Sequence, residues 1–197
     1  VYAGFLEHTD HHVGLLVDAL EELGILDDTL IYYIVGDNGA SAEGTINGTF
    51  NETFLFNGVP QLETPEFMAA RIDKFGGPEA YNHYAVGWAH AMDTPYQWTK
   101  QVASHWGGTR NGTIVHWPRG IATRGEVRSQ FHHVIDVAPT VLEAAGLPQP
   151  TTVDGVAQRP IEGVSMVYSF DGAAEDDRRD TQYFEMFGNR GIYHQGW

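Results

Sequence analysis

The sequence predicts an α/β fold in which helices flank a largely parallel sheet. A pattern with helical period fills residues 5–23, and a continuous apolar run follows directly at Leu30–Val35. A second apolar run and a second amphipathic helix pattern come later, at 113–117 and 137–145. Strands that are covered on both faces are apolar throughout, and helices alternating with such strands are typical of parallel sheets. We therefore expect Leu30–Val35 to be a buried core strand.

Each element of the first half follows from local chemistry. The helix over residues 5–23 should end at Gly24, since glycine takes up the left-handed conformation that closes helices. Residues 25–28 should turn the chain into the Leu30–Val35 strand. The stretch 39–57 is rich in glycine and asparagine with little periodicity, which predicts a long ordered loop beyond the end of the strand. A short helix is expected at 66–75.

The second half contains a strand, a helix and a hairpin. The run 113–117 is a core strand that Pro118 ends, and 131–135 is a further short strand. Asp136 is the expected N-cap of a helix that runs to Ala145 and closes at Gly146.

A hairpin is expected near the C-terminal end of the sequence. Its strands are predicted at 182–187 and 191–193, around Gly188-Asn189. This hairpin would be the start of a small C-terminal antiparallel sheet.

Composition excludes several classes of partner. The chain has 197 residues, 42% of them hydrophobic, which suffices for one domain with a core. A formal charge of −15 disfavours nucleic acid and anionic membrane surfaces, because the long-range field repels both. The absence of cysteine excludes disulfides and cysteine-based zinc sites.

The chain is expected to be soluble, since its sequence contains no apolar run of membrane-spanning length. Its first residue is not Met and its last residues lie inside a strand-like pattern, so we expect a fragment truncated at both ends. The compartment, cytoplasmic or periplasmic and secreted, stays open, as does the oligomeric state.

Asp37 and Asn38 form the first candidate site. They follow the Leu30–Val35 strand between Gly36 and Gly39. Ligands in open α/β sheets gather beyond the carboxyl ends of strands, and carboxylate and amide oxygens suit Ca²⁺, or less well Mg²⁺. Asp-Asn-Gly is also ordinary turn chemistry, so an Asx turn without a metal is the alternative. Calcium needs about six to eight oxygens, so further ligands must come from elsewhere.

Lys100 is the second candidate. It is one of only two lysines, and His105, Arg110 and the pair Gly107-Gly108 follow it closely. A local cationic pocket in an acidic protein predicts a small anionic ligand, and an ammonium point charge suits a tetrahedral oxyanion such as sulfate or phosphate. The glycine pair would let the backbone approach that ligand. The alternative is a lysine exposed on a loop.

A weaker candidate lies on the first helix. His8 and His12 are four residues apart, a spacing that suits zinc, but no complete ligand set accompanies them. Solvated or hydrogen-bonded imidazoles are the alternative, and it is the one we favour.

Four motifs in the same order resemble the arylsulfatases, a family of the alkaline phosphatase superfamily. They are Gly36–Gly39, the Lys100–Arg110 segment ending in Gly-Gly-x-Arg, Val134–Thr140 and Gly188–Gly191. The resemblance implies an alkaline phosphatase-like mixed sheet flanked by helices. It further implies that residues 1–165 are part of the catalytic domain without its N-terminal portion, and that 166–197 begin a truncated C-terminal subdomain.

The resemblance also implies roles for individual residues. Asp37 and Asn38 would bind a calcium ion that also holds the sulfate group, Lys100 would contact that group, and His105 would lie beside the substrate. The small-molecule substrate would be a sulfate ester, attacked by a formylglycine that the family makes within Cys/Ser-x-Pro-x-Arg. This sequence has no such segment, so residues 1–197 alone should be inactive.

Two other functions stay open beside the hydrolysis of sulfate esters. One is a phosphodiesterase or phosphonate monoester hydrolase of the same superfamily. The other is an inactive calcium-binding domain on the same fold, because a fold does not by itself imply activity.

Overall fold

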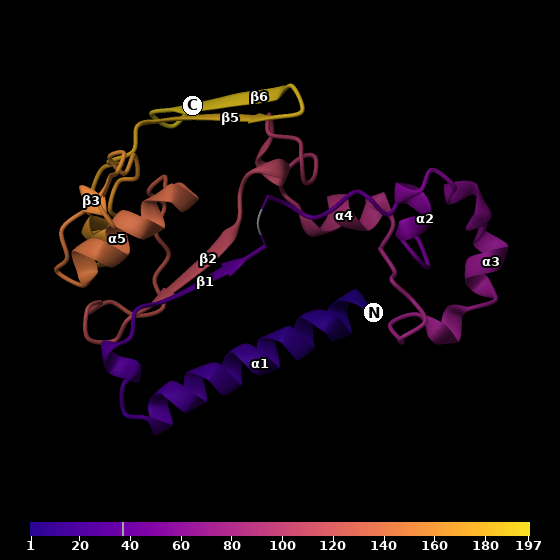
Figure 1. Cartoon of the computed structure of the whole chain (residues 1–197), viewed down its shortest axis with the longest axis horizontal. Helices are drawn as coiled ribbons and strands as arrows, with labels where there is room; N and C mark the ends of the chain where they lie inside the picture. The colour runs from indigo at the N-terminus through magenta and orange to yellow at the C-terminus, as the bar shows by residue number, and fades with distance from the viewer. Residues whose placement is uncertain (37) are drawn as a thin grey trace. The chain divides into compact units, whose positions relative to one another are not determined.

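A computed structural model describes residues 1–36 and 38–197. Its first element is the predicted helix, α1 (Tyr2–Glu22), after which Gly24 has the left-handed φ of 69° that the sequence predicts (Figure 1). No residue of α1 is buried, and apolar side chains such as Leu16 are exposed. Helical periodicity therefore predicted the helix correctly without predicting where its apolar side chains lie.

Two predicted strands form a two-stranded sheet. They are β1 (Ile31–Val35) and β2 (Gly112–His116), which lie side by side in Figure 1. The 3-10 helix η1 (Leu26–Asp28) turns the chain into β1, as expected. The expected burial is wrong, because β1 is half-buried to exposed and β2 is mostly exposed. Among the described residues each of the two strands has one partner strand, and the larger mixed sheet that the resemblance implies stays a prediction.

The chain divides into two compact units. Unit 1 comprises Val1–Leu16, Ile34–Gly112 and Phe184–Gly191. Its loop 39–57 is ordered, as expected, with backbone bridges from Thr49 to His83 and from Asn51 to Tyr81. Unit 1 holds a series of short helices: α2 (Thr53–Phe56), η2 (Pro60–Leu62), α3 (Pro65–Ala69), η3 (Ile72–Lys74), α4 (Val86–Met92) and η4 (Trp106–Gly108).

The apolar core of unit 1 centres on Phe50. Its buried ring meets Phe67 and Phe75 edge-on, at centroid distances of 6.1 and 5.4 Å. Such edge-to-face contacts are a preferred packing of aromatic rings. The core therefore lies among the short helices and not against a sheet.

Unit 2 comprises Val17–Tyr33, Thr113–Tyr183 and Ile192–Trp197. The predicted second helix is α5 (Val137–Ala144), and Gly146 follows it with a φ of 66°. The predicted strand at 131–135 is wrong, since η5 (Val134–Asp136) occupies its end. The remaining elements are the antiparallel strands β3 (Thr152–Val153) and β4 (Val156–Ala157), with Val153 opposite Val156, and α6 (Val167–Phe170).

Asp136 occupies the N-cap position of helix α5, as expected, but its side chain makes no capping hydrogen bond to that helix. Its fully buried carboxylate accepts hydrogen bonds from the backbone N–H groups of His133 and Val164, at 2.8 and 2.7 Å. It also pairs with both the Nε and an Nη of Arg179, whose side chain is 9% exposed. These contacts lower the pKa of Asp136, although burial on its own raises it. A short polar side chain thus joins three separate segments of unit 2.

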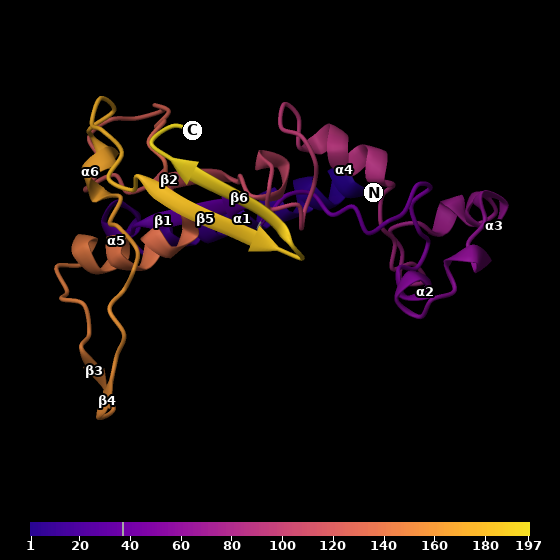
Figure 2. The same cartoon turned by 90° about the horizontal axis from the view of Figure 1, so that it is seen from above.

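The predicted C-terminal hairpin is present. Its strands are β5 (Thr181–Met186) and β6 (Asn189–His194), which lie side by side in Figure 2. The turn is Phe187-Gly188, one residue earlier than expected, and both of its residues have positive φ. The predicted division of the chain at residue 165 stays a prediction.

Candidate functional site

The loop that follows β1 packs against the Lys100 segment. Asp37 lies outside the described residues, and Asn38 and Gly39 follow it. A Cβ atom at Gly39 would lie 1.8 Å from the Gly107 carbonyl oxygen and 3.0 Å from the backbone nitrogen of Lys100. Gly39 also has a φ of 91°. Only glycine combines that conformation with so close an approach. The backbone that follows Asn38 therefore packs against the backbone of Lys100 in unit 1.

Hydrogen bonds hold this loop in place. The Lys100 N–H donates to the Ala40 carbonyl over 3.0 Å, and the Ala40 N–H donates to the Asp93 carboxylate over 3.1 Å. The Ser41 N–H donates to the Tyr84 hydroxyl over 3.0 Å. Burial raises the pKa of Asp93, and the hydrogen bond from Ala40 offsets part of that rise. The loop after the Asp-Asn pair is thus fixed on both sides.

The pair Gly107-Gly108 has a packing role that the sequence did not reveal. A Cβ atom at Gly107 would lie 2.2 Å from the Trp98 carbonyl oxygen, and one at Gly108 would lie 2.3 Å from that of Val102. Both glycines are buried in η4. The two residues therefore let the Trp98–Gly108 segment fold back on itself, which places Lys100 within a tight backbone loop.

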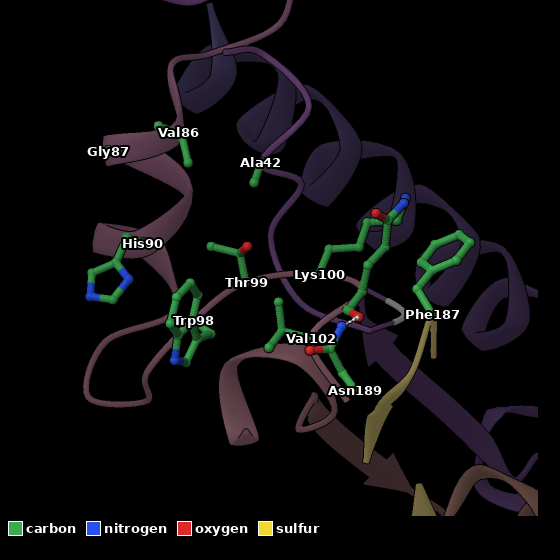
Figure 3. A pocket seen from close by; sticks show the side chains of 11 residues that line it. Ala42, Val86, Gly87, His90, Trp98, Thr99, Lys100, Val102, Phe187 and Asn189 are labelled. Carbon is green, nitrogen blue, oxygen red and sulfur yellow. Dashed lines mark hydrogen bonds between the residues drawn. The ribbon is translucent and has the colours of Figure 1, made fainter. Parts of the chain in front are cut away.

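Lys100 lines a cavity of about 670 Å³, which Figure 3 shows from close by. That volume lies in the range of small-molecule sites. No hydrogen bond or ion pair joins the Lys100 ammonium group to any residue that the structure describes. Five of the ten other lining residues have apolar or aromatic side chains (Ala42, Val86, Trp98, Val102 and Phe187), and the rest are His90, Thr99, Gln101, Asn189 and Gly87. Within the described residues the site thus combines an ammonium group that has no partner with walls that are partly apolar and partly polar.

His105 and Arg110 do not line this cavity. The His105 Nδ1 is 2.9 Å from the Ser104 hydroxyl, and its ring contacts Trp98 at a centroid distance of 5.9 Å. The Arg110 guanidinium lies over the Tyr96 ring at 5.0 Å. Of the cationic residues that the sequence grouped together, only Lys100 reaches the cavity. A role for His105 beside the substrate stays a prediction.

Two lining residues come from the C-terminal hairpin. Phe187 is the first residue of its turn and Asn189 is the first of β6. The Asn189 side-chain amide donates to the Gln101 carbonyl at 3.5 Å, and a Cβ atom at Gly191 would lie 2.9 Å from the Ala103 carbonyl oxygen. Sequence analysis missed both residues, because their contact with Lys100 spans almost half of the chain.

The Asp37-Asn38 pair fits a hard cation in its donor chemistry alone. A carboxylate and an amide oxygen are suitable calcium ligands, but calcium takes about six to eight oxygens. Among the residues described, no group of three His, Asp or Glu side chains could hold a metal ion. On helix α1 the Nε2 atoms of His8 and His12 lie 3.2 Å apart, within hydrogen-bond distance of each other.

Comparison with known proteins identifies the family. The sulfatase family model matches residues 1–147, so the chain belongs to the sulfatase family. Over 169 residues, or 84% of this chain and 33% of the other, it is 28% identical to an arylsulfatase of Klebsiella aerogenes. It is 29% identical over 153 residues to an uncharacterized sulfatase of Schizosaccharomyces pombe, covering 76% and 25% of the two chains. With mouse steryl-sulfatase the identity is 26% over 163 residues, covering 81% and 20%.

The chain therefore spans between 20% and 33% of the length of these relatives. None of the helices in the described part is long and apolar enough to cross a membrane.

Proposed function

We propose that this chain forms part of the active site of an arylsulfatase, which hydrolyses sulfate esters to a phenol or alcohol and sulfate. Membership of the sulfatase family supports the reaction class. The observation that carries the proposal is Lys100, a cation without a partner among the described residues that lines a cavity of substrate size. A small anion that enters this cavity would meet an ammonium group already in place.

Lys100 would bind the sulfate group and stabilise negative charge on its oxygens during the reaction. An ammonium group is a compact point charge with three donors, which suits a tetrahedral anion. Its backbone is fixed by the Ala40 hydrogen bond and by the packing of Gly39 and Gly107. A charge held in place before the reaction needs no reorganisation as the transition state forms, which makes it effective in catalysis.

Asp37 and Asn38 would supply part of a calcium site next to Lys100. Calcium would polarise the sulfate oxygens as a Lewis acid when bound. The remaining ligands, and the formylglycine nucleophile of the family, would come from parts of a full-length protein that this chain does not span. The residues described here would therefore bind and orient the sulfate, and would not complete the reaction alone.

The test is Lys100→Ala in the full-length protein, with 4-nitrophenyl sulfate as substrate. We expect kcat/KM to fall by roughly a hundredfold, the usual effect of removing one preorganised electrostatic partner. Lys74→Ala is the matched control, because Lys74 is the only other lysine and pairs with Glu79 on an exposed surface. EDTA should abolish activity, and calcium should restore it better than magnesium.

Three results would contradict the proposal. Unchanged kcat/KM in Lys100→Ala would exclude the sulfate-binding role. Faster turnover of bis(4-nitrophenyl) phosphate or of a phosphonate monoester than of the sulfate would favour the phosphodiesterase alternative. Calcium binding without any turnover by the full-length protein would favour an inactive domain.

A further inference from the structure

The walls of the cavity beside Lys100 combine aromatic and aliphatic side chains with four further polar ones: His90, Thr99, Gln101 and Asn189. Two lining side chains are amides, and both use their NH₂ groups internally. Gln101 donates to the Glu43 carboxylate at 3.1 Å, and Asn189 donates to the Gln101 carbonyl at 3.5 Å. The aromatic and aliphatic lining residues offer no partner of this kind, so sugar hydroxyls buried against them would lose water without compensation, which is costly. The chemistry of the walls favours an apolar alcohol.

The two aromatic walls adopt backbone conformations that side chains normally avoid. Trp98 has a φ of 66° and Phe187 a φ of 50°, and Gln101 between them in the cavity wall has 74°. Three of the six residues other than glycine with positive φ in the described chain therefore line this one cavity. Backbone strain of this kind concentrates at functional sites, because the surrounding structure must hold it in place.

Phe187 is the more informative of the two. It is the first residue of a two-residue hairpin turn with positive φ at both positions, where asparagine, aspartate or glycine is strongly preferred. Its side chain is 80% exposed, so the fold gains little from burying it. A phenylalanine here is costly in conformation, and burial within this chain does not explain it, which favours contact with a ligand as its role.

We propose that Trp98 and Phe187 form an aromatic subsite that binds the alcohol part of the substrate and selects aryl sulfates over sugar sulfates. The inference rests on the proposed function of Lys100. Figure 3 shows the two rings on opposite sides of the cavity in this view, with Thr99, Lys100 and Val102 between them. The sulfate would lie at Lys100 and the planar aromatic group against the rings, where stacking and apolar contact stabilise it.

The decisive variant is Phe187→Asn in the full-length protein. Asparagine suits the turn, so this variant should melt no lower than the wild type, yet it lacks the ring. We expect the ratio of kcat/KM for 4-methylumbelliferyl sulfate to kcat/KM for glucosamine 6-sulfate to fall about tenfold, the loss of one aromatic contact. Trp98→Phe should keep most of the ratio. Phe56→Ala, an exposed phenylalanine of the same unit outside the cavity, is the control and should keep all of it.

Binding of 4-methylumbelliferone, the product without sulfate, separates this inference from the proposed function. The wild type should bind it, and Phe187→Asn should bind it about tenfold more weakly, even if no sulfate ester is hydrolysed. If the wild type hydrolyses sulfate esters but Phe187→Asn keeps both the substrate ratio and the product affinity, the aromatic subsite is refuted and the sulfatase function stands. A wild type that prefers the sugar sulfate would likewise overturn the subsite.

Discussion

Lys100 in unit 1 and Arg179 in unit 2 are two cations that differ in burial and in pairing with a carboxylate. Arg179 is buried and pairs with the fully buried carboxylate of Asp136, which also accepts two backbone N–H groups. Lys100 is half-buried at a cavity and has no partner among the described residues. A buried charge is costly unless it is paired, so a paired one is explained by the fold alone. The fold of the described residues gives Lys100 no such role, and we propose that it binds an anionic ligand.

The comparison also shows how each unit uses its polar residues. In unit 2, Asp136 joins the segment before α5, the backbone at Val164 and the start of β5 near Arg179. In unit 1, hydrogen bonds of the loop after β1 fix the backbone around Lys100 and leave its side chain uncommitted. We infer that unit 2 uses charge for structure, while unit 1 holds charge ready for a ligand.

The largest expected effect is from Asp136→Asn. Removing one partner of a buried ion pair leaves the other charge uncompensated, which costs about 3–5 kcal/mol of the free energy of unfolding. Urea denaturation of the full-length protein measures this loss. Glu79→Gln removes the carboxylate of the exposed Lys74 pair and should cost about 1 kcal/mol or less. Equal losses in the two variants would contradict the distinction between structural and exposed pairs.

The pH dependence of the free energy of unfolding tests the same ion pair. The pKa of Asp136 lies below its ordinary value of 3.8, so the unfolded state binds more protons, and stability is lost as the pH falls below that value. Burial lowers the pKa of His132 below 6.5, although the charges of Asp136 and Asp177 oppose this. The unfolded state therefore binds more protons at this residue, and the free energy of unfolding also decreases as the pH falls below about 6.5. Asp136→Asn should flatten the acidic part of the curve but not the part near pH 6.5, because loss of the Asp136 charge lowers the pKa of His132 further.

A smaller effect is expected from Gly39→Ala in unit 1. The added methyl group would meet the Gly107 carbonyl at 1.8 Å, and alanine disfavours a φ of 91°. Overpacking of this kind costs about 1–3 kcal/mol. The loop would move away from Lys100, so kcat/KM of the full-length enzyme should fall as well. Gly112→Ala, where no heavy atom lies within 4 Å of the added Cβ, is the control for both measurements.

The smallest effect on stability is expected from Lys100→Met. Because the ammonium group has no partner in the described chain, its removal should change the free energy of unfolding by less than about 0.5 kcal/mol, as for other surface sites without special contacts. Urea denaturation measures it. A decrease in the free energy of unfolding close to that of Asp136→Asn would mean that Lys100 also stabilises the fold. It would contradict the distinction drawn between Lys100 and Arg179.

Local pattern alone determined much of this protein. The helix that ends before Gly24, the strands β1 and β2, helix α5 and the C-terminal hairpin all follow from periodicity, apolar runs and turn residues. Such signals depend on neighbours in the sequence, which is why they can be read without a structure. The same reasoning singled out Lys100, because a rare lysine near glycines stands out in an acidic chain.

Tertiary structure decided the rest. Only contacts between distant segments show that Gly39 packs on Gly107, that Asp136 pairs with Arg179 and not with the start of α5, and that Phe187 reaches the Lys100 cavity. The burial of β1 was overestimated for the same reason. An apolar run indicates that a strand can be buried, but the neighbouring layers decide whether its side chains are covered. Partners far apart in the chain are chosen by the packing of the whole fold, which no local window of sequence contains.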